Sequence, residues 1–188
     1  LEQIRQSKAK ALLTPAAAVP GNAWQPIGPA PIVNGQTSGN TPVSGRIGDI
    51  AVDPANKNHW LVGAAQGGIW ETMNGGATWQ PKTDDQPSLA FGAVTFAPGN
   101  SNIVYAGTGE QVFSADAISG AGLLKSTDGG KTWALIAGGS LASTTFSAIR
   151  VHPADDQVLV AATGNGVFKF PDGGFNGSLR LSGTITDL

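Results

Sequence analysis

The chain has 188 residues and a formal net charge of −2; 13% of its residues are charged and 40% are hydrophobic. It lacks the run of Lys and Arg that nucleic acid or an anionic membrane surface requires, so neither partner is expected. No apolar run approaches the roughly 20 residues that cross a bilayer, so no membrane span is expected. Zero Cys excludes disulfides and thiol chemistry. The 27 Gly and 12 Pro favour short strands with tight turns over helices.

The first 44 residues come before any repeat. Residues 1–23 are predicted to form a short helix, ended by Pro15, and a linker. Residues 24–44 are predicted to form an extended, proline-interrupted strand and a polar loop. No signal peptide is predicted, because Arg5, Lys8 and Lys10 lie where its apolar core would be. A mature secreted protein or an internal fragment would have the same beginning.

From residue 45 the sequence repeats itself in three units, 45–88, 89–143 and an incomplete 144–188. Each begins with an apolar strand, at 47–52, 91–96 and 146–151, that runs into a proline turn. The prolines, Pro54, Pro98 and Pro153, lie 44 and 55 residues apart, and an insertion at 111–120 accounts for the longer interval. Such intervals are typical of propeller blades, each a four-stranded antiparallel sheet. We therefore expect an all-β fold.

Two of the units carry the same eight-residue pattern, Ser/Thr-x-Asp/Asn-x-Gly-x-Thr-Trp. Its members are Thr72, Asn74, Gly76, Thr78 and Trp79 in the first unit and Ser126, Asp128, Gly130, Thr132 and Trp133 in the second. The Asp or Asn side chain accepts backbone N–H groups, Gly supplies positive φ, and Trp packs under the turn, so the pattern predicts a tight hairpin between strands three and four. The third unit keeps Asp172-Gly-Gly but continues Phe-Asn-Gly, which leaves its fourth strand open.

The eight-residue pattern resembles the Asp-box, or bacterial neuraminidase repeat, and the resemblance covers about residues 45–174. The superfamily includes sialidases, xyloglucanases and sortilin-type receptors. The resemblance implies a β-propeller in which the boxes are structural. Gly45-Arg46-Ile47, Gly67-Gly68-Ile69-Trp70 and Gly107-Thr108-Gly109-Glu110 are similar to uncharacterised bacterial secreted Asp-box proteins. That likeness implies an extracellular or cell-surface protein, with no known chemistry and no cofactor.

In a propeller, the connections after the second and fourth strands share one rim, where ligands usually bind. Gln66, Glu110 and Asn165 lie at the same distance from the three turn prolines, so we expect them at one height in a polar ring. The complete set of predicted ligand-binding rim residues is Arg46, Gln66, Glu110, Ser114, Asp116 and Asn165.

Glycoside hydrolysis requires two carboxyl groups on either side of the scissile bond. Glu110, Asp116, Asp84 and Asp85 are the catalytic candidates, against the alternative that they are solvated loop carboxylates. Resemblance to the xyloglucanases implies a catalytic Asp after the second strand of the first unit, but 64–68 contains no carboxylate. Resemblance to the sialidases implies an arginine triad and a Tyr nucleophile. The only Tyr lies within a predicted strand.

Basic and aromatic side chains have structural interpretations. Arg46 is either a ligand-binding residue or part of a rim salt bridge. His59 and His152 lie in or beside the proline turns and are interpreted as surface residues, and no metal site is predicted. Trp60 and Trp70 are expected to pack between units.

Three functions remain open. The favoured one is an extracellular propeller that binds a glycan or a protein through its rim. The alternatives are a sialidase- or xyloglucanase-like glycoside hydrolase, with catalytic residues partly outside this segment, and a structural component of a cell-surface assembly. Three units do not close a ring, so we expect the N-terminal part of a larger propeller, with the remaining blades from the same or another chain.

Overall fold

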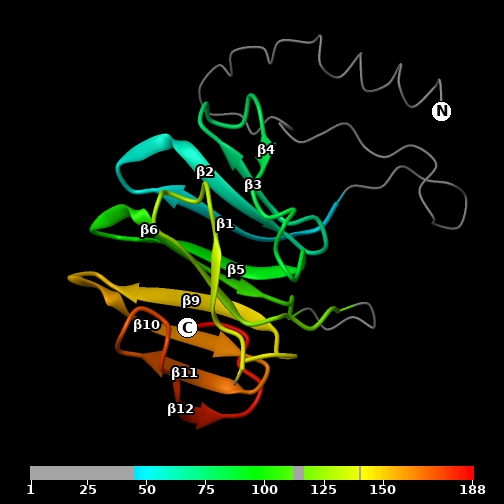
Figure 1. Cartoon of the computed structure of the whole chain (residues 1–188), viewed down its shortest axis with the longest axis vertical. Coiled ribbons are helices and arrows are strands. Elements are labelled where there is room, and N and C mark those ends of the chain that lie inside the picture. The colour runs from blue at the N-terminus through cyan, green and yellow to red at the C-terminus, as the bar shows by residue number, and fades with distance from the viewer. Residues whose placement is uncertain (1–44, 112–116, 140) are drawn as a thin grey trace, which may run out of the picture. The chain divides into compact units, whose positions relative to one another are not determined.

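The computed structural model of the chain describes residues 45–111, 117–139 and 141–188 (Figure 1). Within these ranges, strands and their connections make up the structure and no helix is present. No described segment is therefore a helix long and apolar enough to cross a membrane. The helix and linker predicted at 1–23, and the extended strand and loop predicted at 24–44, lie outside the described residues.

The strands form three antiparallel sheets, each of four strands paired in chain order. The first sheet contains β1 (Ile47–Asp53), β2 (Asn56–Ala64), β3 (Ile69–Thr72) and β4 (Gln80–Pro81). The second contains β5 (Phe91–Ala97), β6 (Asn100–Thr108), β7 (Leu123–Ser126) and β8 (Ala134–Ala137). The third contains β9 (Phe146–His152), β10 (Asp155–Thr163), β11 (Gly166–Phe170) and β12 (Ser178–Ser182). The predicted all-β architecture is confirmed, and the fourth strand of the third unit is formed.

The three sheets share one register relative to the turn prolines. β2, β6 and β10 each have nine residues and begin two residues after Pro54, Pro98 and Pro153. The facing first strands pair equivalently, with Ile47 opposite Ala64, Phe91 opposite Thr108 and Phe146 opposite Thr163. The insertion after β6 therefore leaves the strands in phase, and equivalent positions of the three sheets can be compared directly.

The sheets lie side by side through their first strands, with β5 against both β1 and β9 (Figure 1). One apolar core lies between the first and second sheets, where Leu61 and Ile69 contact residues of β5 that include Phe91. A second core lies between the second and third sheets, where Leu123 packs with Phe146. The first and second sheets thus each bury one face against the next sheet, which is how an antiparallel sheet hides its apolar side.

The two complete eight-residue patterns form equivalent turns. The Ser126 hydroxyl accepts the Gly130 N–H at 2.8 Å and donates to Asp128 Oδ1, which in turn accepts the Thr132 N–H at 2.9 Å. In the first sheet, the Thr72 hydroxyl accepts the Gly76 N–H at 2.9 Å, and Asn74 Oδ1 accepts the Thr78 N–H at 2.9 Å. The second glycine of each turn, Gly76 and Gly130, has φ of 94°. The turn-forming role predicted for the two patterns agrees with these hydrogen bonds.

The turn of the second sheet also contacts the first sheet. A Cβ added to Gly130 would lie 2.7 Å from the Leu61 side chain, and Trp133 packs against the core that contains Leu61. The equivalent Trp79 instead lies beside Trp60 of its own sheet, with ring centroids 6.4 Å apart. The two tryptophans occupy the same position after the turn, but only Trp133 has a preceding sheet among the described residues to pack on.

The third turn compensates for its altered sequence. Phe170 stands at the Ser/Thr position and is fully buried, while Gly177 stands at the Trp position. A Cβ on Gly177 would collide with the Phe170 ring, so the ring fills space that a larger residue at 177 would need. Asp172 still accepts the Asn176 N–H at 3.0 Å, as Asp128 accepts that of Thr132. The hairpin therefore survives without its hydroxyl and its tryptophan.

Candidate functional site

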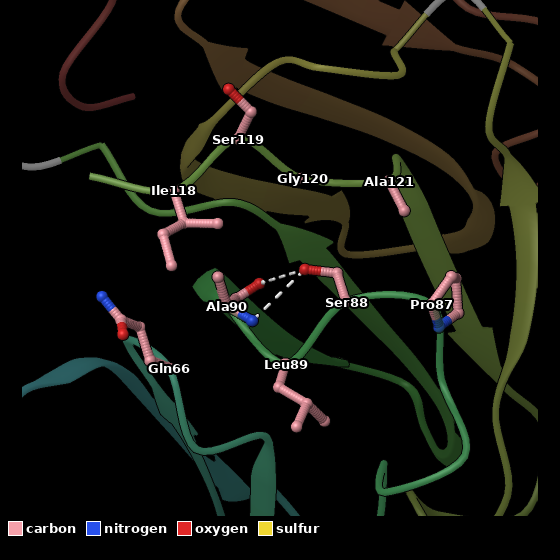
Figure 2. A pocket seen from close by; sticks show the side chains of 9 residues that line it. All are labelled: Gln66, Pro87, Ser88, Leu89, Ala90, Ile118, Ser119, Gly120 and Ala121. Carbon is pink, nitrogen blue, oxygen red and sulfur yellow. Dashed lines mark hydrogen bonds between the residues drawn. The ribbon is translucent and has the colours of Figure 1, made fainter. Parts of the chain in front are cut away.

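Three chain connections meet in a shallow pocket of about 400 Å³ at one end of the first two sheets (Figure 2). Gln66 comes from the connection between β2 and β3, 87–90 from the connection between β4 and β5, and 118–121 from the connection between β6 and β7. These are the connections predicted to share the ligand-binding rim. The lining residues are Gln66, Pro87, Ser88, Leu89, Ala90, Ile118, Ser119, Gly120 and Ala121.

Backbone hydrogen bonds between the connections hold the walls of the pocket. The Gly68 N–H donates to the Leu89 carbonyl at 2.8 Å, and the Gly109 N–H donates to the Ala90 carbonyl at 2.7 Å. On the opposite wall, the Gly120 N–H donates to the Thr144 carbonyl of the third unit at 2.8 Å. The loops are thus attached to the β-sheets at several points, a rigid setting for residues that contact a ligand.

The pocket lining carries no charged side chain. Leu89 and Ile118 are exposed, and Figure 2 shows Ile118 directed toward Ala90 across the pocket. Polar groups come from Gln66, Ser88 and Ser119, and the Ser88 hydroxyl interacts with the backbone of Ala90. Such a mixture can hold an apolar group and orient it through a few hydrogen bonds.

The structure joins two of the predicted rim residues, Arg46 and Glu110, in an ion pair. Arg46 Nε donates to Glu110 Oε2 at 3.0 Å, and Arg46 Nη2 also contacts Glu110 Oε1. Glu110 is only 1% exposed, so its carboxylate is removed from solvent and held by a two-point contact. The salt bridge considered as the alternative for Arg46 is present, and it links residues 64 positions apart.

The other candidates that the structure describes are exposed. Gln66 and Asn165 are exposed, so the three positions expected to form one polar ring differ in burial, with Glu110 turned inward. Asp84 and Asp85 are exposed on the connection between β4 and β5. Ser114 and Asp116 lie outside the described residues. The ligand-binding and catalytic roles assigned to these residues stay predictions.

A buried polar cluster lies at the opposite end of β1 and was not expected. His59 is 6% exposed, so its interpretation as a surface residue is wrong; His152 is exposed, as predicted. His59 Nδ1 lies 2.9 Å from Asp53 Oδ2, and His59 Nε2 lies 3.2 Å from Glu71 Oε1. Lys82 Nζ contacts Glu71 Oε2 at 2.8 Å. The cluster pairs Glu71 with Lys82 inside the protein and lies at the end of β1 opposite to Arg46.

The burial of His59 had a signal in the repeat. The equivalent positions of the other two units hold Ile103 and Val158, which indicates a position that packs inward. Asp53 also accepts the Ser101 hydroxyl from the second sheet. Burial raises the pKa of Asp53, but the hydrogen bonds from Ser101 and His59 outweigh this effect and lower the pKa overall. Among the described residues, no group of three or more His, Cys, Asp and Glu side chains is arranged to hold a metal ion.

The sequence matches no protein-family model and no curated protein. It is similar to solved structures. An ancestral GH74 enzyme matches with a TM-score of 0.60 and 23% identity, over 72% of this chain and 18% of that chain. A GH74 enzyme of Niastella koreensis matches with a TM-score of 0.55 and 21% identity, over 71% and 22%. YCF48 bound to D1 peptide matches with a TM-score of 0.53 and 20% identity, over 71% and 40%.

The neighbours are β-propeller proteins. The three sheets are propeller blades. At these identities the likeness concerns the fold alone, and the chain spans less than half the length of each of these neighbours. The first, second and third sheets are called blades from here on, and β1, β5 and β9 are their inner strands.

Proposed function

We propose that this chain is an extracellular propeller module of the Asp-box type that binds a glycan or a protein ligand through its loop rim. The observation that carries the proposal is the pocket where three inter-strand connections of two blades converge. The hydrogen-bonded turns at Ser126–Thr132 and Thr72–Thr78 support the Asp-box assignment. They lie at the other ends of their strands, which leaves the rim to the variable connections.

The lining of the pocket favours an apolar contact group on the ligand. Leu89 and Ile118 flank the pocket with aliphatic surface, and no formal charge is available there to neutralise an ionic group. A methyl-bearing sugar or an aliphatic peptide side chain has the required chemistry. One neighbouring propeller is bound to a peptide and two are glycoside hydrolases of one class, so ligands of both kinds occur on this fold.

The alternative function is a glycoside hydrolase, supported by the likeness to two GH74 enzymes. Within the described residues, the carboxylates do not favour it. Glu110 is buried and its carboxylate is held by Arg46, so it is not presented to a ligand at the rim. Asp84 and Asp85 are exposed side chains on one loop. Binding without turnover is therefore the proposal, and catalysis remains its competitor, with catalytic residues partly outside this segment.

The second alternative is a structural role in a cell-surface assembly, for which the low charge and high Gly content are compatible. Copurification of the native protein with filaments or envelope, with the pocket unoccupied, would support it. The remaining propeller blades, from the same or another chain, are proposed partners in all three cases.

The test is a screen of polysaccharides, sialosides and a peptide library, read by binding and by release of reducing sugar. Binding without turnover is expected. Ile118→Glu should abolish binding, since it places a charge in the apolar pocket. Leu135→Glu is the matched control, because Leu135 is 42% exposed, as against 43% for Ile118, and does not line the pocket.

Two results would contradict the proposal. If both glutamate variants bind like the unchanged protein, the pocket is not the ligand site. If sugar is released and Glu110→Gln abolishes the release, the protein is a hydrolase and the buried ion pair belongs to its machinery.

A further inference from the structure

The third blade has an exposed apolar face, whose residues occupy positions that are buried under the next blade in the other two blades. Ile69 and Leu123 are fully buried under the next blade, while the equivalent Val167 is partly exposed. Ala137 is 8% exposed, and its equivalent, Leu181, is 57% exposed. The pairing of Leu123 with Ala137 and of Val167 with Leu181 shows that these are equivalent places in their sheets. The third blade thus presents, uncovered, the face that the first two blades bury.

The complementary half of this interface is the inner strand of a following blade. Phe91 and Val94 of β5, and Phe146 and Ile149 of β9, are buried against the blade that precedes them. The equivalent Ile50 of β1 is 56% exposed. An apolar inner strand is therefore what covers such a face at both interfaces within the chain.

Each following inner strand begins with a residue that lies close to the second residue of the inner strand before it. A Cβ on Gly48 would collide with the carbonyl oxygen of Phe91, and a Cβ on Gly92 would collide with that of Phe146. Glycine at these two positions lets the backbones of successive inner strands approach closely. The close approach is thus a marker of where an inner strand begins.

The third blade has the same marker, and the residue beside it is Ile185. The position equivalent to Gly48 and Gly92 is Ser147, whose hydroxyl donates to the Ile185 carbonyl at 2.6 Å. The Ile185 N–H donates to the Thr163 carbonyl at 3.2 Å, at the end of β10. Ile185 is partly buried, while the three residues after it are exposed. The Ile185 carbonyl therefore lies beside Ser147 as the carbonyls of Phe91 and Phe146 lie beside Gly48 and Gly92. The Ile185 N–H bonds to Thr163, one residue before Gly164, which is the equivalent of the Gly109 that accepts the Phe146 N–H.

The sequence agrees with this register. Residues 185–188 read Ile-Thr-Asp-Leu, and residues 47–50, at the start of β1, read Ile-Gly-Asp-Ile. The two apolar residues, separated by three positions, match those of Phe91 and Val94 in β5. An independent observation thus supports what the contacts of Ile185 indicate.

We propose that the face of the third blade around Val167 and Leu181 is a docking surface for a fourth four-stranded antiparallel blade, whose inner strand begins at Ile185. A second copy of this chain fits less well, because the β1 strand of that copy would need the place beside the start of β9 that Ile185 already holds. The partner is a blade with an apolar inner strand. The proposal does not depend on which ligand the rim binds.

The test extends the chain beyond Leu188 with a copy of its own residues 95–143, so that 185–188 take the place of 91–94. The added segment then completes a copy of the second blade in register. We expect the amides of Val167 and Leu181 to exchange at least about tenfold more slowly, and the unfolding midpoint to rise. The control extension carries one extra Ser after Leu188, which turns every added side chain to the other face, and it should protect neither amide.

Two variants of the in-register extension locate the contact. Leu181→Lys should remove the protection, because it places a charge in the docking surface. Leu135→Lys should keep the protection, because Leu135 remains exposed although its blade is followed by another. Equal protection in both variants, or in both extensions, would overturn the proposal.

The unextended chain gives an independent readout if an extension does not fold. The Ile185 amide should be protected from hydrogen exchange in the manner of the Phe146 amide, which donates to the Gly109 carbonyl at 3.1 Å. Exchange of Ile185 at the rate of an unstructured amide would refute the register. If sedimentation shows that the unextended chain forms a dimer, and hydrogen exchange shows that the dimer protects the amides of Val167 and Leu181, the surface binds a second copy and the proposal is wrong.

Discussion

At the scale of residues, the two complete turns differ in the side chain that accepts the backbone N–H groups. Asp128 carries a charge where Asn74 of the first blade carries an amide, and both accept the same backbone N–H with Oδ1. Burial raises the pKa of Asp128, but hydrogen bonds from Thr132 and Ser126 outweigh this effect and lower the pKa to about 2. The neutral Asn74 turn shows that the hairpin does not require the charge.

Asp128→Asn should reduce the acid sensitivity of the protein. The folded-state pKa of Asp128 is below its ordinary value of 3.8, so the stabilising contribution of its charge is present above about pH 4 and is lost as the pH falls toward 2. In urea unfolding, the variant should be modestly less stable than the unchanged protein at pH 7 and nearly equal to it at pH 2. Asn74→Asp should acquire the same pH dependence. Parallel pH profiles for all three proteins would show that the Asp128 charge contributes nothing.

At the scale of elements, the third hairpin shows that a turn can be kept while its packing changes. Phe170 replaces a hydroxyl that would accept the backbone N–H of the second turn glycine, and Gly177 replaces the tryptophan. The two changes are coupled, because the Phe170 ring lies where a side chain at 177 would begin. A turn hydrogen-bonded by Asp172 remains, and β12 pairs with β11.

The coupling can be measured with a double-mutant cycle. Phe170→Ser alone removes a fully buried ring and should cost about 3 kcal/mol, and Gly177→Trp alone should also be destabilising because it overpacks the site. The double variant should lose less than the sum of the two, by at least about 1 kcal/mol in chemical unfolding. Additive losses would mean that the two positions are independent.

At the scale of the whole molecule, adjacent blades are held by close contacts between inner strands and the neighbouring blade. A Cβ on Gly107 of β6 would collide with the ring of Phe146, the first residue of β9. Phe146 is fully buried in the core between the second and third blades. Gly107 is therefore a contact on which the spacing of two blades depends.

Gly107→Ala should destabilise the protein by about 2–3 kcal/mol, because a packed ring and an inner strand would have to move. Gly139→Ala is the control, since nothing lies within 4 Å of its added Cβ. The two variants should differ in the midpoint of thermal unfolding by several degrees. Equal midpoints would show that the interface between these blades tolerates displacement.

The strand pattern and the two complete turns could be predicted from the sequence because their causes are local. Alternation of apolar residues, a proline turn and an Asp or Asn followed by glycines act within about ten residues, and three repeats of them reinforce one another. The burial of His59 could also have been predicted, because the equivalent positions hold the apolar residues Ile103 and Val158, but His59 was interpreted as a surface residue.

The candidate site could be predicted only as a set of loops. That Glu110 is buried against Arg46, that His59 meets Asp53 and Glu71, and that the rim pocket has an uncharged lining were decided by tertiary structure. These contacts join separate strands, and Arg46 and Glu110 belong to two blades. Their geometry depends on how sheets stack and how connections close, whereas strand register depends on neighbouring residues. The amino-acid sequence by itself therefore determined the repeating sheets of this protein, and the stacking of those sheets decided which side chains remain available to a ligand.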